Sequence, residues 1–403
     1  MKRLVFYCPG YDLRPLRSSL PLIEREFEAF LEIRKLAGRL EAPVDGLDPG
    51  RSTATWEGRV SWPGAKVHTR FVQLGWRDVI KPDFERSWPR MAADAISSFW
   101  HYAKAGGYRA AVKSNWAHGL FCLYPEIGFA LCLALGIVPP LLLAAFLFDL
   151  DGDAGPQVSS QLLALAVIIG VSTLWIAGLH RFFSWLEPRI YLRYLINSWH
   201  FMARLARNEH AQMLDRIEEF AELIVAMEEE AGQDEELVFV SHSCGTFVAI
   251  YVLAGVLRRR PEIGQRPGGF AFVTLGPAFE CLGGFGSKGS FSEAMSKVAL
   301  SDVDWTDVYA PHDLVCGGRT APVARYATAI TEADMRREPR RFSVRVPDRM
   351  TKELFRHLRY RFFELHFCYF LSSIRPGLFD FYRLTLGPKR ASAQLEAWSR
   401  GED

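Results

Sequence analysis

The sequence has little net charge and no concentration of basic residues. Its 48 basic and 46 acidic residues give a net charge of +2. No stripe of Lys and Arg with interleaved aromatic residues appears, and such a stripe is the usual mark of a surface that binds nucleic acid. We therefore expect no nucleic-acid partner.

Cysteine and glycine are present without the patterns that mark metal, disulfide or nucleotide sites. The seven cysteines are scattered, with no Cys-x-x-Cys pair, so the sequence predicts neither a zinc site nor a disulfide framework. No phosphate-binding glycine pattern occurs. Residues 276–289 are rich in glycine but are expected to form a flexible loop over a site. We expect no metal and no cofactor.

We also expect no export signal at the start of the sequence. Met1, Lys2 and Arg3 lead into only a short apolar stretch before Pro9, which is too short for the apolar region of a signal peptide. No internal repeat is found.

Two long apolar stretches, residues 127–148 and 162–179, contain no charged residue. Each is long enough to cross a bilayer, because ~20 helical residues span a ~30 Å hydrocarbon core. Neither shows the polar stripe of a soluble amphipathic helix. We predict a transmembrane helical hairpin, with a buried hairpin in a cap domain as the alternative. Pro139 and Pro140 would kink the first helix or break it into a re-entrant pair.

Basic residues flank the two outer ends of this hairpin but are missing from the loop that joins its two helices. Arg109 and Lys113 precede it, and Arg181, Arg189 and Arg193 follow it, whereas residues 149–161 contain no Lys or Arg. The positive-inside rule then predicts an exported loop and a cytoplasmic domain attached to the inner, or cytoplasmic, membrane. Residues 187–227 are expected to form one long amphipathic helix.

Residues 236–251 read ELVFVSHSCGTFVAIY, a strand-like run that continues as a helix-like pattern. A serine on such a sharp strand-to-helix turn needs small residues two before it and two after it. Ser243 has Ser241 and Gly245 at these positions, so the pattern is Ser-x-Ser-x-Gly rather than Gly-x-Ser-x-Gly. Ser243 is the candidate nucleophile, and the N–H of Cys244 at the helix start would face an acyl oxyanion. An ordinary strand with a glycine-containing turn would look the same.

A serine nucleophile needs an acid after a later strand. Residues 305–310 (WTDVYA) predict such a strand, and Asp313 follows its end. Asp302 and Asp304 precede the strand, and Asp307 lies within it. We prefer Asp313 because the carboxyl end of the strand faces the site.

The candidate histidine is His366, in the segment ELHFCYF. Its apolar neighbours also suit a buried core histidine. His357 is the rival, and the basic residues around it predict an exposed helix surface. His242, next to Ser243, is expected to point away from the serine.

The first strand-like run, residues 3–7 (RLVFY), ends at Cys8-Pro9-Gly10-Tyr11. A loop after such a strand normally supplies the second oxyanion donor. Gly10 allows the unusual backbone angles that this loop needs, and the N–H of Tyr11 is the candidate donor. An ordinary Pro-Gly turn is the alternative.

In this order, the segments PGYD, SHSCG, APHD and ELHFCYF resemble those of the α/β-hydrolase superfamily, and the resemblance covers residues 1–120 and 186–370. It implies a mainly parallel sheet with helices on both faces. It also implies that Ser243 is the nucleophile, His366 the general base and then acid, and Asp313 the residue that orients the histidine. The two leading antiparallel strands common in the superfamily are expected to be absent.

These patterns predict an α/β-hydrolase-like domain with an inserted membrane hairpin. Residues 1–120 form its first part, 121–185 the hairpin, 186–370 its second part and 371–403 a polar C-terminal extension. Further expected elements are a helix at 20–40, a β-hairpin at 53–61 and 66–74 whose second arm joins the sheet, and a helix near 391–400.

The expected activity is cleavage of an acyl ester by a membrane-anchored serine hydrolase. A lipid is the expected substrate because the domain would lie at the bilayer. A small acyl ester, a thioester or an acyl transfer would use the same residues. The alternative is a catalytically silent scaffold at the membrane, which the non-glycine residue Ser241 would suit.

Overall fold

The computed structural model describes residues 1–14, 16–41, 52–150, 158–279, 289–318, 321–328, 330 and 337–402. The chain divides into two compact units. The first unit contains Met1–Glu85, Trp100–Cys122 and Phe201–Asp403, and the second contains Arg86–Phe99 and Leu123–His200.

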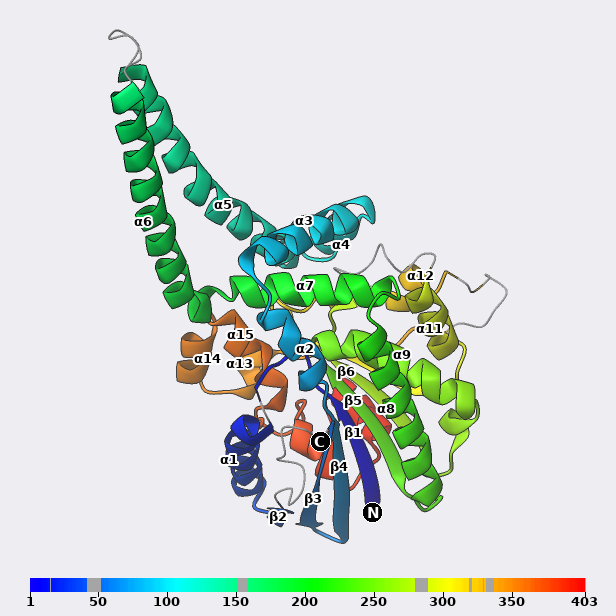
Figure 1. Ribbon diagram of the computed structural model, residues 1–403. Helices are drawn as coiled ribbons and strands as arrows, with labels where there is room; N and C mark the ends of the chain where they lie inside the picture. Colours follow the sequence, from blue (N-terminus) through cyan, green and yellow to red (C-terminus); the bar gives the residue numbers. More distant parts are fainter. Residues whose placement is uncertain are drawn as a thin grey trace. The chain divides into compact units, whose positions relative to one another are not determined.

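One eight-stranded sheet forms the first unit, in the order β2-β3-β4-β1-β5-β6-β7-β8 (Figure 1). β2, β3 and β4 pair antiparallel, and all pairs from β4 to β8 are parallel. The predicted α/β fold with a mainly parallel sheet is therefore confirmed. The strands are β1 (Lys2–Cys8), β2 (Ala37–Glu41), β3 (Thr53–Trp62), β4 (Ala65–Leu74), β5 (Glu236–His242), β6 (Phe270–Leu275), β7 (Asp304–Tyr309) and β8 (Arg340–Ser343).

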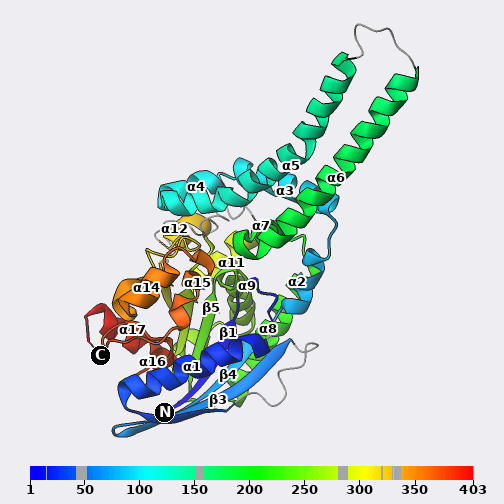
Figure 2. The same cartoon turned by 90° about the vertical axis from the view of Figure 1, so that its left-hand side faces the viewer.

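Helices cover both faces of the sheet, as expected for strands that are apolar on both sides. On one face, Val5 of β1 and Val238 of β5 belong to a core that also holds side chains of α1 (Leu16–Arg34), α16 (Phe381–Leu386) and α17 (Ala391–Ser399). On the other face lie α8 (Ala211–Glu230) and α9 (Cys244–Arg259) (Figures 1 and 2).

The other described helices lie between the strands and after β8. They are α2 (Arg77–Phe84), α3 (Trp88–Lys104), α4 (Gly107–Ser114), α5 (Trp116–Leu150), α6 (Val158–Ile190), α7 (Leu192–Ala206), α11 (Ser290–Ala299), α12 (Pro322–Tyr326), α13 (Val346–Arg349), α14 (Lys352–Leu358) and α15 (Phe362–His366), with short 3-10 turns at Ile263–Gln265 and Cys368–Phe370.

The predicted β-hairpin is confirmed as β3 and β4, and β4 joins the sheet beside β1. The helix expected at 20–40 is wrong at its end. α1 stops at Arg34, Lys35 takes a left-handed φ of 53°, and residues from Ala37 onward form β2. A residue with a positive φ ends a helix, and the spacing of apolar residues cannot reveal such a residue. Antiparallel strands are thus present, although they follow β1 in the chain rather than precede it.

The single amphipathic helix expected at 187–227 is also wrong. α6 ends at Ile190, and Tyr191 has a φ of 54° before α7 begins. α7 ends at Ala206, and Asn208 has a φ of 63° before α8 begins. The apolar periodicity continues across both breaks, so it could not reveal them.

Residues 371–402, expected as a polar extension, contribute to the main core of the first unit. Leu384, Leu386, Leu395 and Trp398 are buried there. The helix expected near 391–400 is confirmed as α17. Residues 371–402 have a modest apolar content, but their helices still cover part of one face of the sheet.

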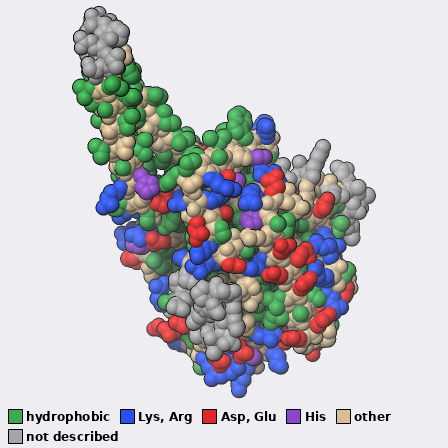
Figure 3. Space-filling model, viewed as in Figure 1, with side chains coloured by type: hydrophobic (Ala, Val, Ile, Leu, Met, Phe, Trp, Pro, Cys, Tyr) green, Lys and Arg blue, Asp and Glu red, His purple; other side chains and the backbone are tan. Residues whose placement is uncertain are grey.

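The second unit contains most of α5 and all of α6, which hold the two predicted spans. Pro139 and Pro140 lie inside α5, which is assigned as one helix. Trp116–Phe148 and Gln161–Ile190 have mean hydropathies of 2.5 and 2.4. In the most apolar 18-residue stretch of each helix, no residue is buried. Figure 3 shows hydrophobic side chains over the surface of both helices. Both are long and apolar enough to cross a membrane.

A hydrophobic cluster of the second unit consists of Met91, Ala95, Phe129, Leu192 and Ile196, contributed by α3, α5 and α7. Hydrogen bonds link the two long helices from Trp175 Nε1 to the carbonyl oxygen of Leu135, at 2.8 Å, and from the Tyr124 hydroxyl to the carbonyl oxygen of Ile190, at 2.9 Å. The loop predicted to be exported lies mostly outside the described residues.

Candidate active site

The carboxyl ends of four parallel strands meet at one edge of the sheet. The register aligns Cys8 of β1 with Ser241 of β5, and Leu275 of β6 with His242 and Val308. Side chains in the loops after these strands therefore come together. This edge is where parallel α/β sheets place their ligands.

Ser243 lies on a sharp turn between β5 and α9. Its φ of 57° and ψ of −132° are sparsely populated by residues other than glycine. The turn is held by the Ser243 N–H, which donates to Leu275 O at 3.0 Å, and by Thr246, whose N–H and hydroxyl both donate to Ser243 O. The backbone thus has the conformation that the sequence predicted for an elbow.

Gly245 is required by close backbone contacts, and Gly10 packs tightly on the Ser243 side chain. A Cβ on Gly245 would lie 2.2 Å from Pro9 O, and a Cβ on Gly10 would lie 3.0 Å from Ser243 Cβ. Ser241 accommodates its side chain, but its buried Oγ has no hydrogen-bond partner in the described part of the chain. Such an unsatisfied hydroxyl is destabilising.

Asp313 contacts His366, so the structure brings together the two residues predicted as acid and base. His366 Nδ1 donates to Asp313 Oδ2 at 2.6 Å, and both side chains are buried. The other Asp313 oxygen accepts the N–H of Val315 at 3.0 Å. This arrangement fixes the imidazole tautomer, because a proton on Nδ1 leaves Nε2 with a lone pair.

The other three aspartates near β7 have different partners. Asp302 pairs with Arg337, and Asp304 with Arg340, on the exposed side of the sheet. Asp307 is buried within β7 and accepts the hydroxyl of Thr274. Burial raises the pKa of Asp307 from 3.8 to about 7, and the bond from Thr274 partly offsets this shift.

The two candidate histidines differ in environment. His366 is at the end of α15 and is 3% exposed, whereas His357 is exposed on α14. His366 Nε2 is buried and has no hydrogen-bond partner among the described residues. It therefore forms no hydrogen bond with Ser243 Oγ in this conformation, as is common in enzymes without bound substrate.

Three neighbours of the acid and base were not assigned a role from the sequence. The Tyr369 hydroxyl donates to Asp313 Oδ2 at 3.1 Å and accepts the N–H of Ala310 at 3.0 Å. Gly276 has a φ of 55°, and a Cβ there would lie 3.0 Å from His366 Cε1. The spacing of Tyr369 from His366 in ELHFCYF was visible in the sequence, but its contact with a loop far along the chain was not.

His242 is the third of these neighbours, and it contacts His366 directly. The two ring centroids are 4.5 Å apart, and His242 Nε2 donates to His366 O at 3.1 Å. Burial lowers the pKa of His242 well below its usual value, and the proximity of His366 acts in the same direction. His242 is therefore a neutral ring packed on the candidate base.

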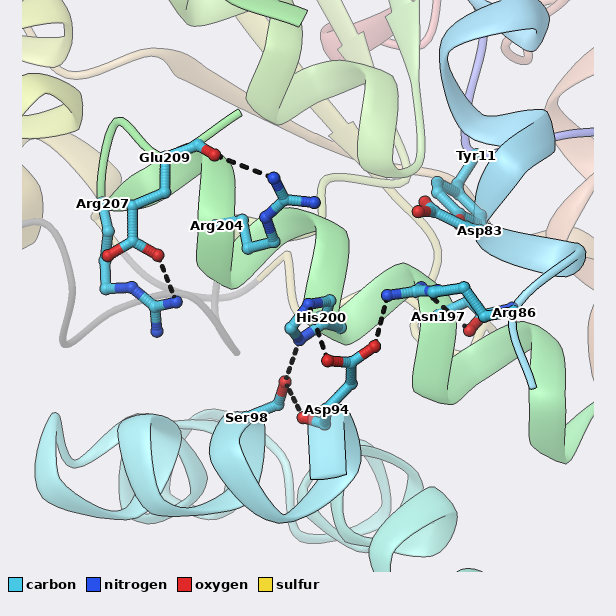
Figure 4. Close-up of polar contacts among 10 residues, drawn as sticks. All are labelled: Tyr11, Asp83, Arg86, Asp94, Ser98, Asn197, His200, Arg204, Arg207 and Glu209. Carbon is cyan, nitrogen blue, oxygen red and sulfur yellow. Dashed lines mark hydrogen bonds and ion pairs between the residues drawn. The ribbon is translucent and has the colours of Figure 1, made fainter. Parts of the chain in front are cut away.

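The predicted oxyanion donors lie in the two segments that meet at Ser243. Cys244 is the first residue of α9. Tyr11 directly follows Gly10, and its hydroxyl donates to Asp83 at 2.7 Å (Figure 4). Its ring packs against Trp76 and Phe201, which anchors the loop. Whether the two N–H groups bind an oxyanion stays a prediction.

A second Ser–His–Asp grouping occurs in the second unit (Figure 4). His200 Nδ1 lies 3.1 Å from Ser98 Oγ, and its Nε2 lies 3.5 Å from Asp94. Ser98 already donates its proton to Asp94 O, so the hydroxyl accepts from His200 and is not activated by it. Arg86 bonds to Asp94 at 2.5 Å and to Asn197 at 3.1 Å. These contacts clamp α3 to α7 rather than form a nucleophile.

No group of His, Cys, Asp and Glu side chains suited to a metal ion occurs among the described residues. No protein-family model, no curated protein and no solved structure matches the chain.

Proposed function

We propose that the protein is a membrane-anchored serine hydrolase of the α/β-hydrolase type that cleaves an acyl ester, with a lipid as its substrate. The observation that carries the proposal is the 2.6 Å contact between His366 and Asp313 at the sheet edge where Ser243 has its strained turn. These three side chains come from the segments after β5, β7 and β8, in the order that such a triad requires.

In the proposed reaction, Ser243 Oγ attacks the acyl carbon while His366 Nε2 takes the serine proton. Asp313 accepts the Nδ1–H and so stabilises the imidazolium that forms. His366 then returns the proton to the leaving alcohol, which departs and leaves an acyl-enzyme. Water attacks this acyl group by the same route, with His366 again as the base, and releases the acid and free Ser243.

The N–H groups of Cys244 and Tyr11 are the proposed donors to the oxyanion. Cys244 begins a helix, whose first N–H groups favour negative charge. Gly10 packs against Ser243, and we therefore expect the N–H of Tyr11, the next residue, to face the reacting centre. Loss of one such donor typically lowers kcat by about 10²-fold to 10³-fold.

The membrane part of the proposal is supported by the two long apolar helices. Exposed leucine, isoleucine and phenylalanine side chains along α5 and α6 have no cover from the described chain. Together with the basic residues that flank the hairpin, they favour attachment to the inner membrane with the sheet on the cytoplasmic side. A hydrolase held there would meet lipid esters first.

Activity-based labelling with a fluorophosphonate tests the catalytic part. We expect the detergent-solubilised wild type to be labelled, and Ser243→Ala and His366→Ala to lose labelling by at least about 10²-fold. His357→Ala is the matched control, because His357 is an exposed histidine close in sequence, and it should label like the wild type.

A folded wild-type protein that is not labelled would reject the hydrolase. The second candidate, a silent membrane scaffold, would then take its place. One observation favours this candidate: the buried Ser241 hydroxyl has no hydrogen-bond partner among the described residues.

A further inference from the structure

The start of α5 contacts the loop that carries Asp313. His118, in the first turn of α5, donates from Nδ1 to the carbonyl oxygen of Leu314 at 2.9 Å. Ser114, just before α5, donates from Oγ to Gly317 O at 3.4 Å. Two hydrogen bonds therefore link this loop to the residues at the start of α5.

The same part of α5 contacts the segment that carries His366. The ring of Phe121 packs edge-on against Phe362 and Phe363, with centroid distances of 5.8 Å and 6.4 Å. Both partners belong to α15, which ends at His366. One helix turn thus contacts the supports of both members of the acid–base pair.

The start of α5 is itself well fixed within the first unit. The Asn115 side chain accepts the N–H of Ala117 at 3.1 Å, which caps the helix. A Cβ on Gly119 would lie 2.4 Å from Val112, so α4 packs directly on this turn. His118 is 2% exposed, and its Nε2 lies 3.5 Å from Cys122 Sγ.

We infer that His118 and Phe121 are positioning residues for the Asp313–His366 pair, through which α5 sets the rate of the proposed reaction. The inference rests on the proposed function. Asp313 and His366 come from loops after different strands, and their 2.6 Å contact survives only if both loops keep their places. A misplacement of ~1 Å in such a pair can lower a rate by about 10²-fold.

The contact also gives α5 a second role besides attachment. α5 is one helix from Trp116 to Leu150, so the turn that contacts both loops continues directly into the apolar span. The helix that forms the first apolar span therefore also contacts the supports of Asp313 and His366.

The test compares the rate and the final extent of fluorophosphonate labelling of Ser243 in the full-length protein. His118→Phe removes the donor to Leu314, and we expect its labelling rate to fall by about tenfold. His118→Asn keeps an N–H near the Nδ1 position and should restore the rate to within about threefold of the wild type. Leu120→Ala changes an exposed neighbour on the same turn and is the control.

The final extent of labelling separates positioning from folding. A variant that only unfolds part of the protein would reduce the labelled fraction and leave the rate of the folded fraction unchanged. We expect the reverse, with full labelling reached slowly. If His118→Phe does not fold, Phe121→Leu decides the matter, and a rate at least about threefold below the wild type is expected.

Unchanged rates in His118→Phe, or in Phe121→Leu where that variant decides, would overturn the inference while leaving the labelled wild type as a hydrolase. Absence of labelling in the wild type would reject the proposed function, and the inference with it. The two failures are therefore distinguishable in one experiment.

Discussion

Two apolar regions of this chain have opposite surroundings. α9 is buried at every position from Cys244 to Leu257, between the sheet and helices such as α8 and α11. In the most apolar 18-residue stretches of α5 and α6, no residue is buried. The difference teaches that hydropathy alone does not say what covers a helix. For α9 the cover is the chain itself, and for α5 and α6 we propose a bilayer.

Glycine shows the same contrast in atomic detail. A Cβ at Gly245 of α9 would meet Pro9 O at 2.2 Å, and one at Gly255 would meet Ala221 Cβ at 2.9 Å. At Gly136, Gly170 and Gly178 in the hairpin, no described atom lies within 4 Å of the added Cβ. Close packing therefore leaves no room for a side chain at these glycines of the buried helix, whereas the glycines of the exposed helices have room for one.

The largest effect is expected from Gly245→Ala. Backbone atoms of Pro9 and Cys8 occupy the place of the new methyl group, so we expect a loss of more than about 3 kcal/mol in the free energy of unfolding. Gly170→Ala, in α6, should be neutral or slightly stabilising, since Ala favours helix by about 1 kcal/mol. Chemical unfolding of both variants checks this, and equal stabilities would contradict the contrast.

Leu174→Arg tests what covers the hairpin. Leu174 is 75% exposed near the middle of α6. In lipid the charge costs about 3 kcal/mol, so we expect a clear loss of the carbonate-resistant membrane fraction, whereas in water the change would cost almost nothing. Leu300→Arg, at an exposed position of the first unit, is the control. Unchanged membrane association of Leu174→Arg would argue against a spanning α6.

The stability of the sheet should depend on pH because of Asp307, whereas the apolar segments of the hairpin have no charged group that could titrate. Residues 127–148 and 162–179 contain no charged residue, whereas the sheet buries this carboxyl, whose pKa rises to about 7. Between pH ~4 and pH ~7 the folded state therefore binds the proton more tightly than the unfolded state, and stability falls as pH rises. The expected loss is about 3 kcal/mol and should vanish in Asp307→Asn. Parallel stability curves for the two proteins would contradict the assignment.

The smallest effect is expected from Trp175→Phe. It removes the hydrogen bond to Leu135 O, while the bond from Tyr124 to Ile190 O still joins α5 and α6. Such bonds between membrane helices contribute about 0.6 kcal/mol on average, so we expect a loss of that size in the unfolding free energy in lipid. Ile176→Val, at the next exposed position, is the control. A loss of several times that size would mean that the hairpin depends on this one contact.

Much of the fold could be predicted because its signals are local. The strand, turn and helix around Ser243 follow from a run of consecutive residues, and the β3–β4 hairpin follows from alternation around Gly64. The breaks at Lys35, Tyr191 and Asn208 could not be predicted, because each depends on one residue with a positive φ that leaves the apolar spacing intact.

The candidate site divides in the same way. The contact between Asp313 and His366 was predicted because both follow sheet strands, whose carboxyl ends share one edge. The contacts of His242 with His366 and of His118 with Leu314 join segments more than 100 residues apart. No periodicity or motif connects such residues, so only the folded chain could reveal them.

The place of β1 in the middle of the sheet has a consequence for biosynthesis. Leu4 pairs with Arg70 of β4 on one side and with Leu237 of β5 on the other. α5 and α6 leave the ribosome between these two partners. β1 must therefore wait with one edge unpaired, and open to other chains, until the whole hairpin has been made. A ribosome stalled before residue 236 would hold a nascent chain whose central strand has made only half of its pairings.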